Sequence, residues 1–419
     1  KKLPWEVVRS PVEVSEKMPS FVFVELLFAL LALSCFVHSY KKGRTYILVW
    51  WASILVGCAN DAIFMFLPGV DNFFHAQGTI MLTPRLPLYI LFVYNSFMYL
   101  SVVSGFQLKL GMVANSAVVG LLAELVYCCY DLLGVKLLWW TWHDTDIAVS
   151  QRIFDVPIGS TMWVITFASS FYFLLNILSF KIRRIGWFQF VLITIALCLF
   201  TTPLMMLQMG FFQVLGVMGC PNELSLLLLI LVYLLVISLK MIYSGNWLQK
   251  RFNPAMVDGF LSGVVNIYFS CLAFIGFYFS SEVPVSEGVH QVLGACGVKE
   301  LDLSGMVRDK FLCATGYDEQ FRIHGTASGE LQWYTISGVP NEYHDVWIII
   351  ICTLGLLGIT AFTYMFTATA PTPKNSGNVG TTRTPSMNPI NAKKVSTNTI
   401  PKPSAKPTLK SRAKKKKNQ

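Results

Sequence analysis

The sequence is poor in charged residues and lacks the short motifs that mark many soluble enzymes. Only 13% of its 419 residues are Asp, Glu, Lys or Arg, about half of the ~25% that soluble globular domains carry. It contains no phosphate-binding Gly loop, no Gly-x-Ser-x-Gly elbow, no Asn-x-Ser/Thr sequon and no Cys-x-x-Cys pair. The composition excludes an ordinary soluble domain. The missing motifs exclude little, because membrane enzymes often lack such signatures.

Long apolar runs take the place of charge. The sequence is 54% hydrophobic, its mean hydropathy is +0.55, and the runs are Leu-, Phe-, Ile- and Val-rich without the strict alternation of barrel strands. Runs of about 20 residues are long enough to cross a bilayer as helices. We therefore predict an all-α membrane protein, a polytopic bundle of about nine transmembrane helices. They cover roughly 19–38, 46–67, 86–104, 113–135, 158–180, 187–208, 222–242, 256–280 and 346–368.

The charge pattern predicts an orientation. The net charge is +10, but residues 370–419 hold twelve Lys or Arg and no acid, so removing them leaves −2 for the rest. Alternate short loops carry the remaining basic clusters, and such loops face the cytosol. The C-terminus is then cytosolic and, with an odd number of spans, the N-terminus lies on the far, lumenal side. The basic loop residues are Lys41, Lys42, Arg44, Lys109, Lys181, Arg183, Arg184, Lys250 and Arg251.

This topology divides the chain into five segments. They are a lumenal N-terminal segment (1–18), an eight-helix membrane domain (19–280), a lumenal loop (281–345), a last transmembrane helix (346–368) and a basic cytosolic tail (369–419).

The lumenal loop has two local features. Residues 321–325 and 331–336 flank Ser328-Gly329 and are typical of a β-hairpin. Cys296 and Cys313 share the loop, and we expect a disulfide between them if the compartment is oxidising. The alternative is two unpaired thiols.

The tail has almost no large apolar side chains, so we predict that it is disordered. It ends Lys416-Lys417-Asn418-Gln419, which resembles the dilysine signal by which coat machinery retrieves membrane proteins to the endoplasmic reticulum. The competing interpretation is a basic run that attracts anionic lipid. We expect no specific nucleic-acid partner, because charge alone is the only attraction to RNA that the tail offers.

Ionisable groups within the spans suggest a site. Charge inside a bilayer is costly, and Glu25, Asp61 and Glu124 fall within predicted spans one, two and four. By the predicted topology, Glu25 and Asp61 lie ~9 Å below the lumenal surface, at ~1.5 Å per residue, and Glu124 lies near the midplane. The loops above them supply His75, Arg85 and the run Trp139–Asp146. We expect these groups to meet in one pocket open to the lumen.

Three interpretations of this cluster compete. As a metal site, His75, His143, Asp144 and Asp146 supply the ligand types of zinc or non-haem iron, which implies a divalent metal cofactor. His143 and Asp146 share a face only if this stretch is helical. As a structural feature, Trp139, Trp140 and Trp142 form an interfacial aromatic belt, a reading that includes transport without catalysis.

The third interpretation is acid–base chemistry on a lipid or isoprenoid. Glu124 is then the proton donor, and His143 and Asp61 are base or partner. Arg85 orients a polar head group, and Trp139, Trp140 and Trp142 contact the substrate. We take this as the leading hypothesis, with the lipid bilayer and the lipid substrate as partners. The alternatives are a transporter or channel component and a membrane-protein scaffold acting through residues 281–345, so enzymatic activity stays open.

A local resemblance accompanies this hypothesis. The order Glu124, Tyr127, Gly134, the Trp/His/Asp run, Val156-Pro157-Ile158 and Trp163 resembles that of bacterial carotenoid hydratase-like membrane proteins. The resemblance implies action on isoprenoid double bonds and is confined to this part of the chain. As a whole, the chain is more similar to uncharacterised polytopic membrane families of animals and protists, which implies architecture and no activity.

Overall fold

Long apolar helices dominate the computed structural model, which describes residues 5–67, 73–143, 145, 147–179, 182, 185–244, 258–279, 282–301, 307–313, 315, 321–324 and 331–367. Eight of the described helices are long and apolar enough to cross a membrane. The predicted helical, multi-pass membrane architecture is thereby confirmed in outline. The eight are α2 (Pro19–Lys42), α3 (Arg44–Phe66), α5 (Met112–Lys136), α7 (Ile158–Ser179), α8 (Trp187–Val217), α9 (Asn222–Ser244), α10 (Gly259–Tyr278) and α11 (His344–Thr367).

The remaining predicted span forms the shorter helix α4 (Tyr89–Gly105). Its 17 residues rise ~26 Å at ~1.5 Å each, slightly less than a bilayer core of ~30 Å. All of its residues except Leu91 and Phe92 are buried, so α4 is surrounded by other helices and need not match the bilayer by itself. Two short helices, α1 (Pro11–Lys17) and α6 (Ile147–Ser150), complete the helical part.

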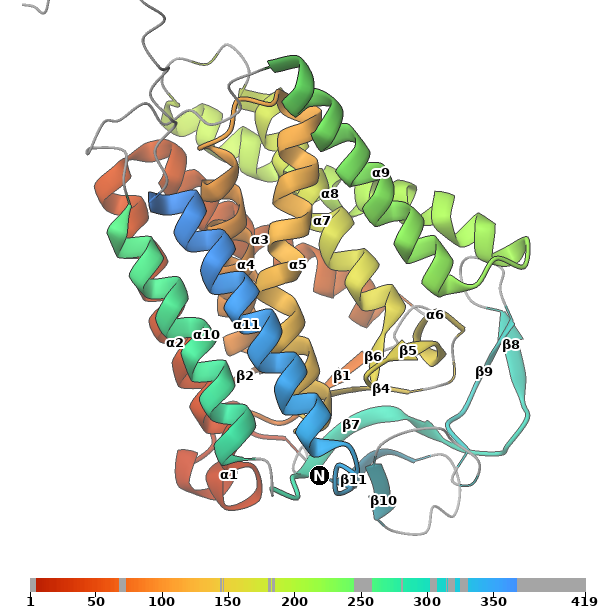
Figure 1. Ribbon diagram of the computed structural model, residues 1–419. Helices are drawn as coiled ribbons and strands as arrows, with labels where there is room; N and C mark the ends of the chain where they lie inside the picture. The colour runs from red at the N-terminus through yellow and green to blue at the C-terminus, as the bar shows by residue number, and fades with distance from the viewer. Residues whose placement is uncertain are drawn as a thin grey trace, which may run out of the picture. The chain divides into compact units, whose positions relative to one another are not determined.

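The strands lie together at one end of the helix bundle (Figure 1). The largest sheet has three antiparallel strands in the order β10-β11-β7, and the other strands form two-stranded pairs. The strands are β1 (Phe73–His75), β2 (Met81–Thr83), β3 (Leu86–Pro87), β4 (Trp140–Trp142), β5 (Arg152–Ile153), β6 (Val156–Pro157), β7 (Val285–Leu293), β8 (Lys299–Leu301), β9 (Val307–Asp309), β10 (Phe321–His324) and β11 (Leu331–Gly338).

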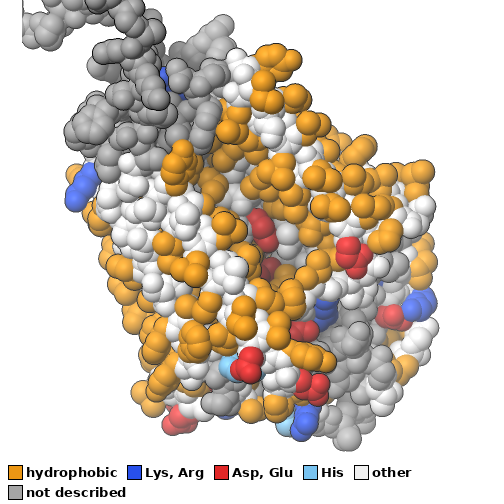
Figure 2. All heavy atoms as spheres, in the orientation of Figure 1, with side chains coloured by type: hydrophobic (Ala, Val, Ile, Leu, Met, Phe, Trp, Pro, Cys, Tyr) orange, Lys and Arg blue, Asp and Glu red, His pale blue; other side chains and the backbone are white. Residues whose placement is uncertain are grey.

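The three-stranded sheet contains the two segments that the sequence singles out as a hairpin. Strands β10 and β11 pair antiparallel from Phe321 opposite Gly338 to His324 opposite Thr335. Residues 325–330, with the expected turn, lie outside the described residues. Cys296 and Cys313 are joined by a disulfide. Figure 2 shows one face of the molecule, with hydrophobic side chains over its helical part and most of the charged side chains near the strand end.

Strands β1 and β4 form a ribbon that closes the bundle at the strand end. Its register pairs Phe73 with Trp142, Phe74 with Thr141 and His75 with Trp140. Because side chains alternate along a strand, His75 and Trp140 belong to one face, and Phe74 and Thr141 to the other. The ribbon rests on α5 at Gly134, where the Cβ of any other residue would lie 2.0 Å from the Trp140 ring. Glycine at this position therefore lets the ribbon approach the helix.

A buried polar network ties helices together at the opposite end. The imidazole of His38 contacts the Tyr99 hydroxyl through Nδ1 (2.6 Å) and Asp258 Oδ2 through Nε2 (2.7 Å). Lys42 Nζ lies 2.9 Å from the same carboxylate. Asp258 also begins α10, since its side chain accepts from Leu261 N. The network joins α2, α4 and α10, and the sequence alone did not reveal it.

Candidate functional site

A cavity of about 200 Å³ lies between α3, α4, α5, α7 and α8, under the β1–β4 ribbon. A cavity of ~150 Å³ holds a benzene-sized molecule, so this one accepts one end of a larger ligand. The ribbon contributes Phe73, His75, Trp140 and Trp142 to its wall, as strand alternation requires. One lining residue of α8, Met206, is 49% exposed. The cavity therefore borders the outer surface of the bundle at α8.

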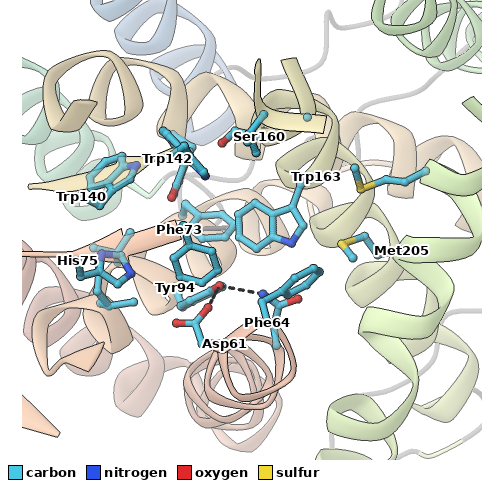
Figure 3. A pocket seen from close by; sticks show the side chains of 18 of the residues that line it. Asp61, Phe64, Phe73, His75, Tyr94, Trp140, Trp142, Ser160, Trp163 and Met205 are labelled. Atoms are coloured by element: carbon cyan, nitrogen blue, oxygen red, sulfur yellow. Dashed lines mark hydrogen bonds between the residues drawn. The ribbon is translucent and has the colours of Figure 1, made fainter. Parts of the chain in front are cut away.

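Asp61 is the carboxylate of this cavity. It is 2% exposed, and the Tyr94 hydroxyl donates to its Oδ1 at 2.5 Å. Asn60 donates to the Tyr94 oxygen (3.1 Å), and Thr202 donates to Asn60 (3.2 Å). Asp61 Oδ2 is buried and has no hydrogen-bond partner among the described residues. Figure 3 shows Asp61 bonded to Tyr94.

His75 lies on the ribbon side of the same cavity (Figure 3). Burial, and secondarily the charge of Arg85, lowers the pKa of its imidazole to about 3. The ring is therefore neutral at physiological pH. Its Nδ1 atom is buried without a hydrogen-bond partner in the described part of the chain, so it is available to a ligand.

A second carboxylate stands behind the cavity wall, and the sequence analysis missed it. Asp131 on α5 is 2% exposed and accepts a hydrogen bond from Ser160 (2.7 Å), which lines the cavity. Asp131 Oδ1 has no partner among the described residues. A signal was present, because Asp131 follows Glu124 by seven residues and thus shares its helix face. Tyr94 and Ser160 gave no such signal, since hydroxyl side chains are common in membrane helices.

Two acids that were expected in the pocket do not line it. Both oxygens of Glu25 accept from Thr79 N (3.0 and 3.3 Å), so Glu25 fixes the loop before β2. Glu124 lies seven residues before Asp131, or ~10 Å along α5, and is partly exposed. Figure 2 shows acidic atoms in a hollow of the apolar face. The expectation of one cluster containing Glu25, Asp61, Glu124 and His143 is therefore wrong.

Arg85 and Trp139 also lie elsewhere than predicted. The Arg85 guanidinium donates to the carbonyls of Met65 (3.2 Å) and Phe73 (2.7 Å) and stacks 4.2 Å over the Phe74 ring. Trp139 is fully buried, and its indole donates to Ser20 (3.0 Å). Neither residue lines the cavity. Both hold the ribbon in place, and of the three tryptophans expected to contact a substrate only Trp140 and Trp142 reach the cavity.

His143 is separated from His75 by the ribbon itself. It follows β4 on the side of Thr141, and its ring packs against Phe74 (5.1 Å between centroids) and His290 (5.6 Å). An extended strand, not the helix that a shared face with Asp146 requires, places His143 away from Asp61. Within the described residues, no three His, Cys, Asp or Glu side chains come together as a metal site. Asp144 and Asp146 lie outside those residues.

The paired histidines predict a pH effect. Burial, and then the nearby His143, holds the pKa of His290 well below its ordinary value. As the pH falls below ~6.5, His290 is protonated in the unfolded chain but stays neutral in the folded protein. The free energy of unfolding therefore falls by up to ~1.4 kcal/mol per pH unit. Replacing His290 with Gln should make this loss shallower between pH 6.5 and 5 in thermal unfolding. The exposed His324→Gln variant is the control, and parallel curves for both variants would contradict the prediction.

Comparison with known proteins places the chain in a family. A domain family described as "Domain of unknown function (DUF7802)" matches residues 5–368. That range contains every residue of the cavity wall. No curated protein and no solved structure matches the chain, so the likeness to carotenoid hydratase-like proteins finds no support among them. The match covers most of the sequence, and the chain therefore belongs to the DUF7802 family.

Proposed function

We propose that this membrane protein binds a lipid or an isoprenoid in the cavity under the β1–β4 ribbon, with the polar end of that molecule against Asp61. The observation that carries the proposal is a buried carboxylate oxygen without a partner among the described residues, in a cavity walled mainly by aromatic and aliphatic side chains. A buried polar atom is costly unless it is hydrogen-bonded. A bound polar group would supply the missing contact.

The position of the cavity supports an amphipathic ligand. Asp61 lies five residues before the end of α3, or ~8 Å along the helix, so a head group reaches it from the membrane surface. Met206, which lines the cavity and is half-exposed, marks a side where an apolar chain can lie along α8.

Proton transfer is the reaction class that these groups support. The Tyr94 hydroxyl holds Asp61 as an acceptor, so its free oxygen can take a proton from a bound molecule. Neutral His75, on the same cavity wall, can accept or donate a second one. Relative to the sequence-based hypothesis, Asp61 takes the place of Glu124, and His75 takes that of His143. The sequence shows no inverted repeat of the kind that would favour the transporter alternative.

Blocking the cavity tests the proposal. Val93 is a buried lining residue on α4, and Val93→Trp should fill the space and remove the lipid that copurifies with wild-type protein. Val264→Trp fills a separate apolar groove between α2 and α10 and should leave that lipid in place. Mass spectrometry of the bound lipid measures both. Retention in the Val93 variant at the wild-type level, with the fold intact, would refute cavity binding.

For the orientation, we propose that the strand end faces the lumen of the endoplasmic reticulum. The disulfide Cys296–Cys313 belongs to this end, and disulfides persist in oxidising compartments. The basic loops after α2 and α4 lie at the other end. The dilysine at Lys416 and Lys417 lies outside the described residues. A membrane-impermeant maleimide added to intact microsomes after reduction should not label Cys296. Labelling of Cys296 without detergent would contradict the proposed orientation.

A further inference from the structure

The described wall of the cavity holds one carboxylate, that of Asp61, and no Lys or Arg side chain. The Arg85 guanidinium stacks on Phe74 and donates to the backbone carbonyls of Met65 and Phe73, and it is not itself a lining residue. His75 itself is uncharged at physiological pH. A ligand that reaches Asp61 therefore meets a carboxylate in a described wall that contains no Lys or Arg.

Burial disfavours the charged form of Asp61, and the hydrogen bonds around it offset part of that cost. Thr202 donates to Asn60, Asn60 donates to Tyr94, and the Tyr94 hydroxyl, having accepted that bond, donates to Asp61. Each donor in this chain points toward the carboxylate. Hydrogen bonds that end on a carboxylate stabilise its ionised state, and Oδ2, which has no donor among the described residues, is left for the ligand.

The rest of the wall is rich in aromatic side chains. Trp163 is the centre of the group, with ring centroids 5.9 Å from Tyr94, 6.3 Å from Phe97 and 6.1 Å from Tyr127. Phe73, Trp140 and Trp142 add rings from the ribbon. Figure 3 shows Phe73, Tyr94 and Trp163 gathered beside Asp61. The faces of such rings carry negative potential, and they attract cations most strongly where water is excluded.

We propose that the cavity binds a quaternary ammonium group, such as the trimethylammonium end of a choline headgroup. This ligand needs what the wall offers, namely aromatic faces and one carboxylate, and its contact with Asp61 Oδ2 is electrostatic and not a hydrogen bond. Its compact shape suits a cavity of about 200 Å³. An anionic or neutral hydroxylated headgroup would instead leave the charge of Asp61 opposed or unbalanced. The inference rests on the proposed function for binding alone, because it names the polar end of the molecule that the cavity holds, and a quaternary ammonium has no N–H proton to give to Asp61.

A matched pair of ligands tests this inference on the wild-type protein. Dodecylphosphocholine carries the trimethylammonium group, and its 3,3-dimethylbutyl isostere replaces that nitrogen with carbon at nearly the same size. With the full chain in nanodiscs free of choline lipids, we expect the cationic ligand to bind at least tenfold more tightly. Asp61→Asn should reduce this preference to within about threefold. Trp163→Phe, which keeps a ring with a weaker cation affinity, should reduce it in part.

The outcomes separate the two proposals. If the wild-type protein binds both ligands with affinities within twofold of each other, the proposed recognition of a cation is wrong, and lipid binding in the cavity is unaffected. Failure of both to bind would overturn the proposed function together with the inference. Free tetramethylammonium distinguishes the source, since competition by it at millimolar concentration supports recognition of the ammonium group itself. Absence of any competition would show that the aliphatic chain, and not the cation, directs binding.

Discussion

Replacing Asp61 with Asn should keep or raise the stability of the protein while weakening the retention of lipid in its cavity. The Asn side-chain oxygen can still accept from the Tyr94 hydroxyl, which now bonds Asp61 Oδ1 at 2.5 Å. The substitution removes the charge on Oδ2, which has no partner among the described residues. An unsatisfied buried polar group costs more when it is charged. The Asn amide nitrogen stays unpaired but is uncharged, so the free energy of unfolding should rise by about 1 kcal/mol or less in the lipid-free protein.

A variant that gains stability and loses binding indicates that the replaced side chain serves function. Residues that serve function often lower stability, and replacing them raises it. Thermal unfolding in one fixed detergent, with mass spectrometry of retained lipid, measures both quantities. The matched variant Asp61→Ala also loses the acceptor for Tyr94 and should be less stable than Asp61→Asn. An Asp61→Asn protein that unfolds more easily and still retains lipid would show that Asp61 is structural.

The helices were predictable because the bilayer imposes a simple rule on their sequences. A spanning helix must be apolar over about 20 residues, so eight helices long enough to span fall close to the predicted ranges. The same rule predicts less well for α4. This helix has only 17 residues, and it can be shorter than the bilayer core because other helices surround it.

The site was less predictable because its geometry depends on pairing between distant segments. The run Trp139–Asp146 suggested a helix or an interfacial belt, whereas Trp140–Trp142 pairs with Phe73–His75, more than sixty residues earlier. That pairing determines which side chains face the cavity, and neither segment predicts it by itself. Asp61 and His75 were identified from chemistry alone. Tyr94 and Ser160, which bond the two buried aspartates, become visible only when helices are placed side by side.

The polar network at the other end of the bundle predicts the largest loss of stability. Asp258 accepts from His38 and Lys42, and its backbone N–H donates to Phe366 O (2.9 Å). Burial would raise the pKa of this carboxyl, but the hydrogen bonds from His38 and Lys42 outweigh burial and hold the pKa below its ordinary value. Its charge is therefore present at neutral pH and is shared between two partners on α2.

Asp258→Ala should lower the free energy of unfolding by about 3 kcal/mol, the low end of the range for a broken buried pair, because buried His38 loses its acceptor while the Lys42 side chain, 36% exposed, can turn to water. It also removes the cap of α10, which contributes about 1 kcal/mol of that loss. Asp258→Asn keeps an acceptor for Leu261 N and should lose less. Lys17→Ala breaks a pair with Glu287 whose side chains are 49% and 43% exposed, and exposed pairs contribute about 1 kcal/mol or less. Equal losses in Asp258→Ala and Lys17→Ala would contradict the prediction.

The Asp258→Asn variant also tests whether the polar network affects the cavity at the other end of the bundle. Tyr99, which contacts His38, lies five residues after Tyr94 on α4, or ~8 Å along the helix. Loosening the network frees the end of the helix that presents Tyr94 to Asp61. At temperatures where Asp258→Asn is still folded, we therefore expect weaker lipid retention than in the wild type, although the substitution lies far from the cavity. Unchanged retention in that variant would show that α4 is held by its packing alone, and that the network serves stability without affecting the site.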